Sequence, residues 1–153
     1  MVLYGADPGT NSNILGEADL DVEWSGAVAR NATIVYVYST SVNTASQYAI
    51  DRNLAPVISF SFGGCEPSSS AAFRSIAQQA SAQGITWLAS SGDSGAAGCD
   101  AAFSGAQATK GLAVTFPASI PEITAVGGAM FSEAGGTSYW AATNGPNHGS
   151  ALS

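Results

Sequence analysis

Short runs of β-branched and aromatic residues alternate along this chain with longer stretches whose apolar residues lie three or four positions apart. The short runs are typical of strands and the longer stretches of helices. The pattern predicts helices over residues 16–29, 43–53 and 69–82, and strands over residues 33–39, 57–62, 85–89 and 122–126. Apolar residues cover more than one face of the first helix, which predicts that it is largely buried. Residues 1–13 and 96–116 are rich in turn formers or irregular in pattern and predict loops.

Strand and helix alternate three times, and each crossover is long enough for a helix. This order predicts an α/β fold in which a parallel sheet is covered by helices on both faces. The functional groups of such sheets gather at the carboxyl ends of the strands. Two of those ends, residues 59–64 and 90–95, are polar and glycine-rich. At 153 residues, the chain is long enough for one domain and too short for two.

Composition removes several classes of function. Apolar residues make up 46% of the chain and charged residues 10%, which excludes a disordered acidic tail. The net charge is −7 and only four residues are basic, so we expect no binding to nucleic acid or to an anionic membrane. No apolar run approaches the length that spans a membrane, and the sequence after Met1 is not typical of a signal peptide.

Two acidic residues on the first predicted helix are candidates for acid–base chemistry. Glu17 and Asp21 are four residues apart and therefore share one helical face. Like charges at this spacing repel, and no basic residue follows to compensate, so the helix does not need them for stability. Two close carboxyls can share a proton, which suits a general base at acidic pH. The alternative is a solvated helix start, which we expect for Asp19 and Glu23.

Asp93 follows a predicted strand and lies between glycines. One interpretation is a turn aspartate that caps nearby backbone donors. The other is a carboxyl that stays protonated in an apolar pocket and donates a hydrogen bond to a developing oxyanion. The sequence alone leaves both open.

Four motifs together resemble the sedolisin family of serine-carboxyl peptidases. The run Gly16-Glu17-Ala18-Asp19-Leu20-Asp21-Val22-Glu23 resembles the Glu-x-x-x-Asp helix of the family. Ser61-Phe62-Gly63 resembles its substrate-lining strand end, and residues 90–95 resemble its oxyanion-site signature. Pro117-Ala118-Ser119 with Val126-Gly127-Gly128 resembles the segment that follows. The motifs occur in the family's order over most of residues 16–128, which makes the resemblance specific.

The resemblance implies a subtilisin-like fold, secretion, and hydrolysis of peptide bonds in polypeptides at acidic pH. It implies that Glu17 is the general base, that Asp21 orients Glu17 and shares its proton, and that Asp93 supplies the oxyanion hydrogen bond. It also implies that Ser61, Phe62 and Gly63 bind substrate. Subtilisins use a histidine base and a neutral amide in the corresponding places, and their replacement by carboxyls moves the working range to low pH.

The sequence departs from the family pattern in three respects. The family's nucleophile lies in a Ser-Gly-Thr-Ser-like motif, and the nearest match here, Gly135-Gly136-Thr137-Ser138, lies too close to the last predicted strand. We assign no nucleophile, find no counterpart of the family's calcium site, and find no opening strand before the first helix. Residues 1–153 are therefore expected to form a single partial catalytic domain, incomplete at the opening strand and the nucleophile helix, and inactive alone.

The two cysteines lie in equivalent positions. Cys65 and Cys99 each follow the carboxyl end of a predicted strand, in glycine-rich loops. Because sequential parallel strands often pair, the loops should meet at one rim of the sheet, and we expect a disulfide between them. A disulfide favours an oxidising, secreted origin. The spacing matches no zinc motif and His148 is the only histidine, so we expect no metal site and no cofactor.

Two alternatives remain. Gly92-Asp93-Ser94-Gly95 superficially resembles an esterase block, so Ser94 or Ser138 with His148 as base would make a hydrolase of another class. The other alternative is a non-catalytic fragment that associates with itself. Without an opening strand, residues 33–39 would expose a strand edge with no charge or proline to deter pairing. This predicts a homo-oligomer through that edge, unless residues 1–13 or 129–153 cover it.

Overall fold

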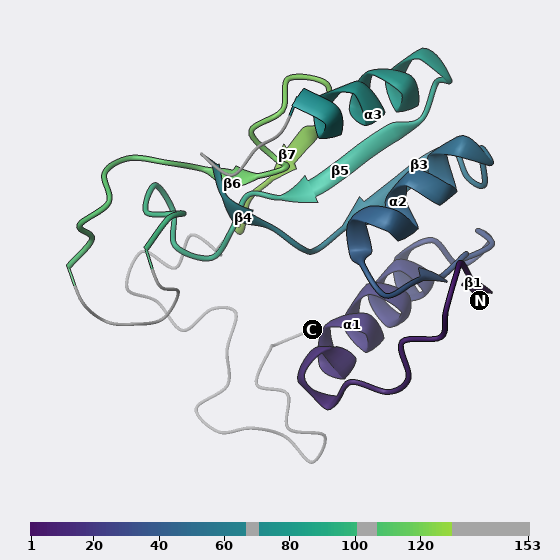
Figure 1. The fold of residues 1–153 in the computed structure, drawn as a ribbon. Coiled ribbons are helices and arrows are strands. Elements are labelled where there is room, and N and C mark those ends of the chain that lie inside the picture. Colours follow the sequence, from purple (N-terminus) through teal and green to yellow (C-terminus); the bar gives the residue numbers. More distant parts are fainter. Residues whose placement is uncertain (67–70, 101–106, 130–153) are drawn as a thin grey trace.

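The structure, a computed structural model, describes residues 1–66, 71–100 and 107–129 of the chain (Figure 1). The helices are α1 (Ser12–Val28), α2 (Val42–Asp51) and α3 (Ala71–Ala82). The strands are β1 (Val2–Leu3), β2 (Val37–Tyr38), β3 (Val57–Phe60), β4 (Gly64–Cys65), β5 (Thr86–Ser90), β6 (Thr115–Phe116) and β7 (Thr124–Val126). All seven predicted elements are present, although the strand predicted over residues 33–39 is reduced to Val37–Tyr38. Three further strands of two residues each, β1, β4 and β6, were not predicted.

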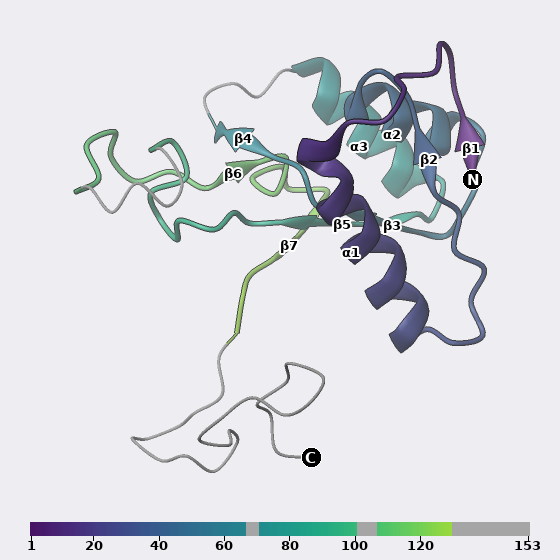
Figure 2. The same ribbon diagram turned by 90° about the horizontal axis from the view of Figure 1, so that it is seen from below.

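A parallel sheet in the order β3-β5-β7 forms the centre of the described structure. Val57 pairs with Thr86 in β5, and Leu88 pairs with Thr124 in β7. The strands predicted over residues 57–62, 85–89 and 122–126 thus pair in sequential order, as is common for parallel strands. In Figure 1, α3 lies above the strands and α1 below them, and Figure 2 shows α1 in front of β3 and β5. Helices therefore flank the sheet from two sides.

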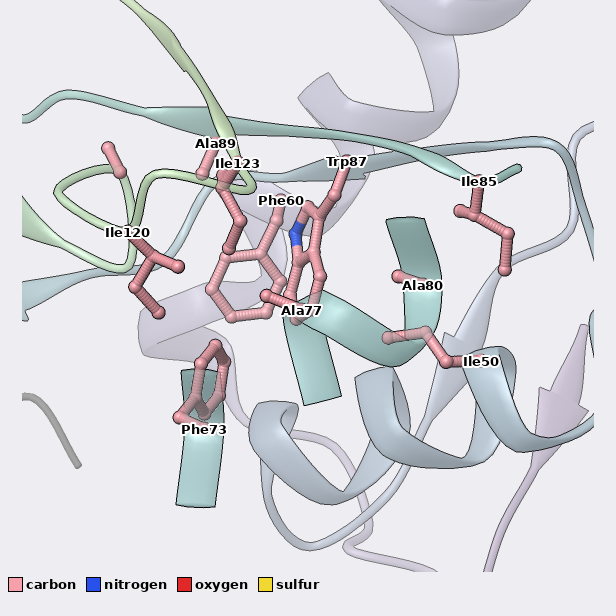
Figure 3. Packing of buried hydrophobic residues seen from close by; sticks show 11 residues of the cluster. Ile50, Phe60, Phe73, Ala77, Ala80, Ile85, Trp87, Ala89, Ile120 and Ile123 are labelled. Atoms are coloured by element: carbon pink, nitrogen blue, oxygen red, sulfur yellow. The ribbon is translucent and has the colours of Figure 1, made fainter. Parts of the chain in front are cut away.

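The hydrophobic core fills the space between the sheet and the helices α2 and α3 (Figure 3). Trp87 of β5 is 1% exposed, and its ring contacts Phe60 of β3 and Phe73 of α3 at centroid distances of 5.8 and 5.4 Å. Ile50 of α2 is fully buried beside them. Alternation along β5 explains this arrangement, because Trp87 and Ala89 point to the same face of the sheet.

Helix α1 is the exception to this packing. It begins at Ser12, four residues before the predicted start, because the Asn11 side chain caps it by accepting a hydrogen bond from the backbone N–H of Asn13 at 3.0 Å. None of its residues is buried. The prediction of a largely buried helix is wrong, because its apolar residues spread over two flanks instead of forming one stripe toward the sheet.

The start of the chain is not a loop. Val2–Leu3 forms β1, which pairs in parallel with Val37–Tyr38. Val2 N–H donates to the carbonyl of Tyr36, and Tyr4 N–H donates to that of Tyr38. The expectation that a strand before α1 is missing is therefore wrong. β1 also covers one side of residues 37–38, which belong to the edge on which the expected homo-oligomer rested. The pair β1-β2 forms its own two-stranded sheet, so β2 does not pair with the next strand of the chain, β3.

Residues 96–116, expected to be irregular, contain β6 at their end. Thr115–Phe116 pairs antiparallel with Gly64–Cys65, just past the end of β3. Figure 1 shows β4 and β6 beside the arrowhead of β5, at the carboxyl ends of the strands. We call this edge the carboxyl rim: residues 61–66, 91–100 and 113–116.

Candidate active site

A hydrogen bond joins the acidic helix to the carboxyl rim. The Ser61 hydroxyl, directly after β3, donates to Oδ1 of Asp21 on α1 at 2.5 Å. Both side chains are half-buried. The two residues are 40 positions apart in sequence, so the contact is made by the fold and not by local structure. The structure thus brings together two of the motifs that carry the family resemblance.

Glu17 lies one helical turn before Asp21 and is also half-buried. Asp19 and Glu23 are exposed, as expected for solvated acids of the helix surface. The half-buried residues of α1 are the polar residues Glu17, Asp21 and Ser25, which recur every four residues, and the small residues Ala18 and Gly26 beside them. Within the described residues, the Glu17 carboxyl has no hydrogen-bond partner.

The three residues expected to bind substrate have different surroundings. Ser61 is engaged with Asp21. Phe62 is half-buried and packs against the core, with its ring 6.2 Å from that of Phe60 in an edge-on arrangement. Gly63 is exposed at the rim. Of the three, Gly63 therefore presents the most open surface to a ligand, through its backbone.

Asp93 lies in the turn that follows β5. It is exposed, whereas the interpretation as a protonated carboxyl requires an apolar pocket. Among the described residues, none donates a hydrogen bond to its carboxyl. Gly92, the residue before Asp93, has φ +94°, a backbone conformation that glycine adopts without strain. The structure brings the Asp93 turn and the end of β3 to one rim, because β3 and β5 are paired neighbours.

A disulfide between Cys65 and Cys99 ties the rim together, as the sequence predicts. The Cα atoms are 4.5 Å apart, although the residues are 34 positions apart in sequence. Gly98 N–H donates to the carbonyl of Ala113 at 3.0 Å, and Ala113 N–H donates to that of Ala96 at 2.9 Å. The turn after β5 is therefore fixed both to β4, through the disulfide, and to the segment that leads into β6.

Two carboxylates away from α1 have strong partners. Arg74 of α3 forms an ion pair with Glu122 at 3.1 Å, and its hydrogen bonds lower the pKa of the Glu122 carboxyl. Asp100 accepts hydrogen bonds from the backbone N–H groups of Thr109 and Lys110, and the first of these is the main cause of a lowered Asp100 pKa. Both carboxylates tie a loop to another segment of the chain. Sequence patterns did not indicate them because the partners are distant along the chain.

The remaining candidate groups are Ser94, Ser138 and His148. Ser94 is half-buried in the turn after Asp93, whereas Ser138 and His148 lie outside the described residues. Among residues 1–66, 71–100 and 107–129, no three His, Cys, Asp or Glu side chains gather in a way that could hold a metal ion. None of the helices in these ranges combines the length and apolar character needed to cross a membrane.

Comparisons with known proteins agree with this geometry. No family model matches the chain. Kumamolisin from Bacillus sp. (strain MN-32) is 34% identical over 150 residues, which cover 88% of this chain and 25% of kumamolisin. The solved structure of Pseudomonas sedolisin, a serine-carboxyl proteinase in complex with two molecules of pseudo-iodotyrostatin, superposes with a TM-score of 0.67 and 26% identity.

That superposition covers 99% of this chain and 48% of the sedolisin chain. The chain thus spans about a quarter of one relative's length and about half of the other's. The match confirms the α/β fold, with a parallel sheet and flanking helices, that the resemblance implies.

Proposed function

Because the chain belongs to the sedolisin family over the part that it spans, we propose that it provides the acidic part of a serine-carboxyl peptidase site. The reaction is the hydrolysis of peptide bonds in polypeptides at acidic pH. The observation that carries the proposal is the hydrogen bond between Ser61 and Asp21, because it holds the helix of the two acids against the carboxyl rim. In parallel sheets, that rim is where reacting groups are placed.

Each acid has a role in the proposal. Glu17 is the general base, since its half-buried carboxyl is left without a partner among the described residues. Asp21 lies one turn away on the same face and orients Glu17, while Ser61 in turn orients Asp21. Asp93 supplies the oxyanion hydrogen bond once a bound substrate, or a further part of the protein, covers its now exposed turn.

We further propose that residues 1–153 alone do not turn over substrate. No serine of the sequence lies in a family-like nucleophile motif at the expected distance from Asp93. Members of a catalytic triad act as a unit, so the remaining groups retain little of the rate without the nucleophile. Incubation of the chain with an unfolded protein at acidic pH should therefore give no fragments. Cleavage that is abolished by Glu17→Gln would show that a nucleophile is present after all.

A chimera tests the acidic residues themselves. The matching quarter of kumamolisin is replaced by this chain, and the hydrolysis of an unfolded protein is measured at acidic pH. We expect the chimera to cleave, and Glu17→Gln to lower its rate by about 10²–10⁴-fold, because a general base is lost. Asp19→Asn, an exposed acid of the same helix, is the matched control and should leave the rate unchanged. A folded chimera whose rate is indifferent to Glu17→Gln would refute the assignment.

The esterase alternative predicts a different result. A reagent that labels active-site serines should then modify Ser94 or Ser138 of the chain alone, and His148→Gln should prevent it. We favour the peptidase proposal because the Ser61–Asp21 bond has no role in the esterase interpretation.

The disulfide supports secretion as part of the proposal, since such bonds persist in oxidising compartments. We do not extend the proposal to a homo-oligomer through residues 33–39, because β1 pairs with residues 37–38 of that edge.

A further inference from the structure

Thr115 lies at the centre of the carboxyl rim and is 8% exposed. On one side, its strand pairs with β4, where Thr115 lies opposite Cys65. On the other side, Ala113, which lies two residues before Thr115, exchanges backbone hydrogen bonds with the turn at residues 96–98. The segment that carries Thr115 is thus held between the two loops that the disulfide joins.

Two glycines of the rim leave room for this side chain. A Cβ atom built on Gly63 would lie 2.2 Å from Cγ2 of Thr115, and one built on Gly92 would lie 2.1 Å from its Oγ1. Both distances are far below any real contact of a Cβ atom. The neighbouring Gly64 has nothing within 4 Å of such an atom. Because positions 63 and 92 carry glycine, there is space for the methyl group of Thr115 at the first and for its hydroxyl group at the second.

The two branches of the Thr115 side chain face different turns of the carboxyl rim. The methyl group of Thr115 faces the end of β3, which carries Ser61 and Gly63. Its hydroxyl oxygen faces the turn after β5, which carries Gly92 and Asp93. Close packing makes the position of each turn depend on the atom that it touches, since packed interiors transmit displacements of a few tenths of an ångström.

We propose that Thr115 is a positioning residue, and that its two branches separately set the places of the substrate-lining end of β3 and of the Asp93 turn. The roles of the two turns in this inference rest on the proposed function. The packing of Thr115 against them does not. Nothing in the residues around Thr115 signals the role in sequence, because both partners are glycines far from it along the chain.

A pair of conservative substitutions separates the branches. Thr115→Ser removes the methyl that faces Gly63 and keeps the oxygen that faces Gly92. Thr115→Val keeps a methyl toward Gly63 and replaces the oxygen with a larger methyl group toward Gly92. Backbone amide shifts of the chain are recorded for both variants. Thr115→Ser should move the signals of residues 61–64 and Thr115→Val those of residues 91–94. Thr124→Val, on an exposed position of β7, is the control and should move neither set.

A kinetic readout distinguishes positioning from simple packing. In the kumamolisin chimera, Thr115→Ser should raise KM with little change in kcat, and Thr115→Val should lower kcat with little change in KM. About a 10-fold effect is expected in each case, because small misplacements of positioned groups are costly. Equal effects of both variants on both turns, no movement of either turn, or an active chimera without the KM–kcat split would overturn the inference. If the amide shifts follow the pattern and the chimera does not cleave, the positioning role stands and the proposed function fails.

Discussion

Helices α1 and α3 lie on different sides of the sheet and differ in what they turn toward it (Figure 1). Helix α3 directs Phe73, Ala77 and Ala80 into the core, with exposures of 5%, 1% and 1%. Helix α1 directs Glu17, Asp21 and Ser25 inward and has no buried residue. Its large apolar side chains are instead exposed, and Trp24 keeps 67% of its surface open.

The difference shows that an apolar residue count does not decide which helix is buried. The apolar residues of α3 fall at spacings of four and three, so they form one stripe. Those of α1 fall on both flanks of a polar stripe, and the hydrogen bond from Ser61 to Asp21 takes the place of apolar packing. Stability of the described structure is therefore concentrated on the α3 side, and candidate chemistry on the α1 side.

The largest difference in stability is expected between substitutions of one aromatic residue from each helix. Phe73→Ala should lower the free energy of unfolding by about 3–5 kcal/mol, because it leaves a cavity beside Trp87. Trp24→Ala, although the side chain is larger, should change it by no more than about 0.5 kcal/mol, as is usual for exposed positions. Urea denaturation of both variants measures the difference. Similar costs at the two positions would mean that α1 is packed as firmly as α3.

An intermediate loss of stability is expected when the disulfide of the carboxyl rim is removed. Replacing Cys65 and Cys99 together by serine should cost about 2–4 kcal/mol, because a cross-link over 34 residues restricts the unfolded chain. The measurement is urea denaturation of the double variant beside the oxidised chain. A loss well below 1 kcal/mol would indicate that the backbone hydrogen bonds around Ala113 already fix the rim without the disulfide.

The smallest effect is a pH dependence on the α3 side. The pKa of Glu122 is lowered from its ordinary value of 4.5 by Arg74, so its contribution to stability is present above that value and is lost as the pH falls through the folded-state pKa. The urea midpoint should therefore be lower for Glu122→Gln than for the original chain at neutral pH, and the difference should shrink in acid.

Arg74→Gln should reproduce this pattern, because it removes the other half of the same ion pair. Since the pair lies at the surface, with 53% of the Arg74 side chain and 18% of the Glu122 side chain exposed, the shift should be small and should decrease further in high salt. A difference that grows as the pH falls would have the wrong sign for this pair.

Local patterns were sufficient for most of the fold. The boundaries of α2 and α3 lie within about two residues of their predicted positions, and β5 begins one residue late, because apolar periodicity and end signals such as Gly84 are encoded nearby. The disulfide was also predictable, since its cysteines follow paired parallel strands.

The features that sequence reasoning missed depend on distant partners. The two-residue strands β1 and β6 exist only through pairing with β2 and β4, so no run of β-formers marks them. The acids at Glu17 and Asp21 were identifiable from their spacing, but the link to Ser61 spans 40 residues and appears only in the fold. Asp93, for which one interpretation required an apolar pocket, is exposed.

The central claim is that the Ser61–Asp21 hydrogen bond, and not apolar packing, holds the acidic helix to the rim. A double-mutant cycle with Asp21→Ala and Ser61→Ala tests it, with amide hydrogen exchange of α1 as the measure of its local stability. We predict a coupling free energy of about 1 kcal/mol, which is the typical net contribution of a hydrogen bond within a protein. Ser59→Ala, an exposed serine of β3, should be additive with Asp21→Ala. Additive effects of Asp21→Ala and Ser61→Ala would contradict the account, because α1 would then be held by other contacts.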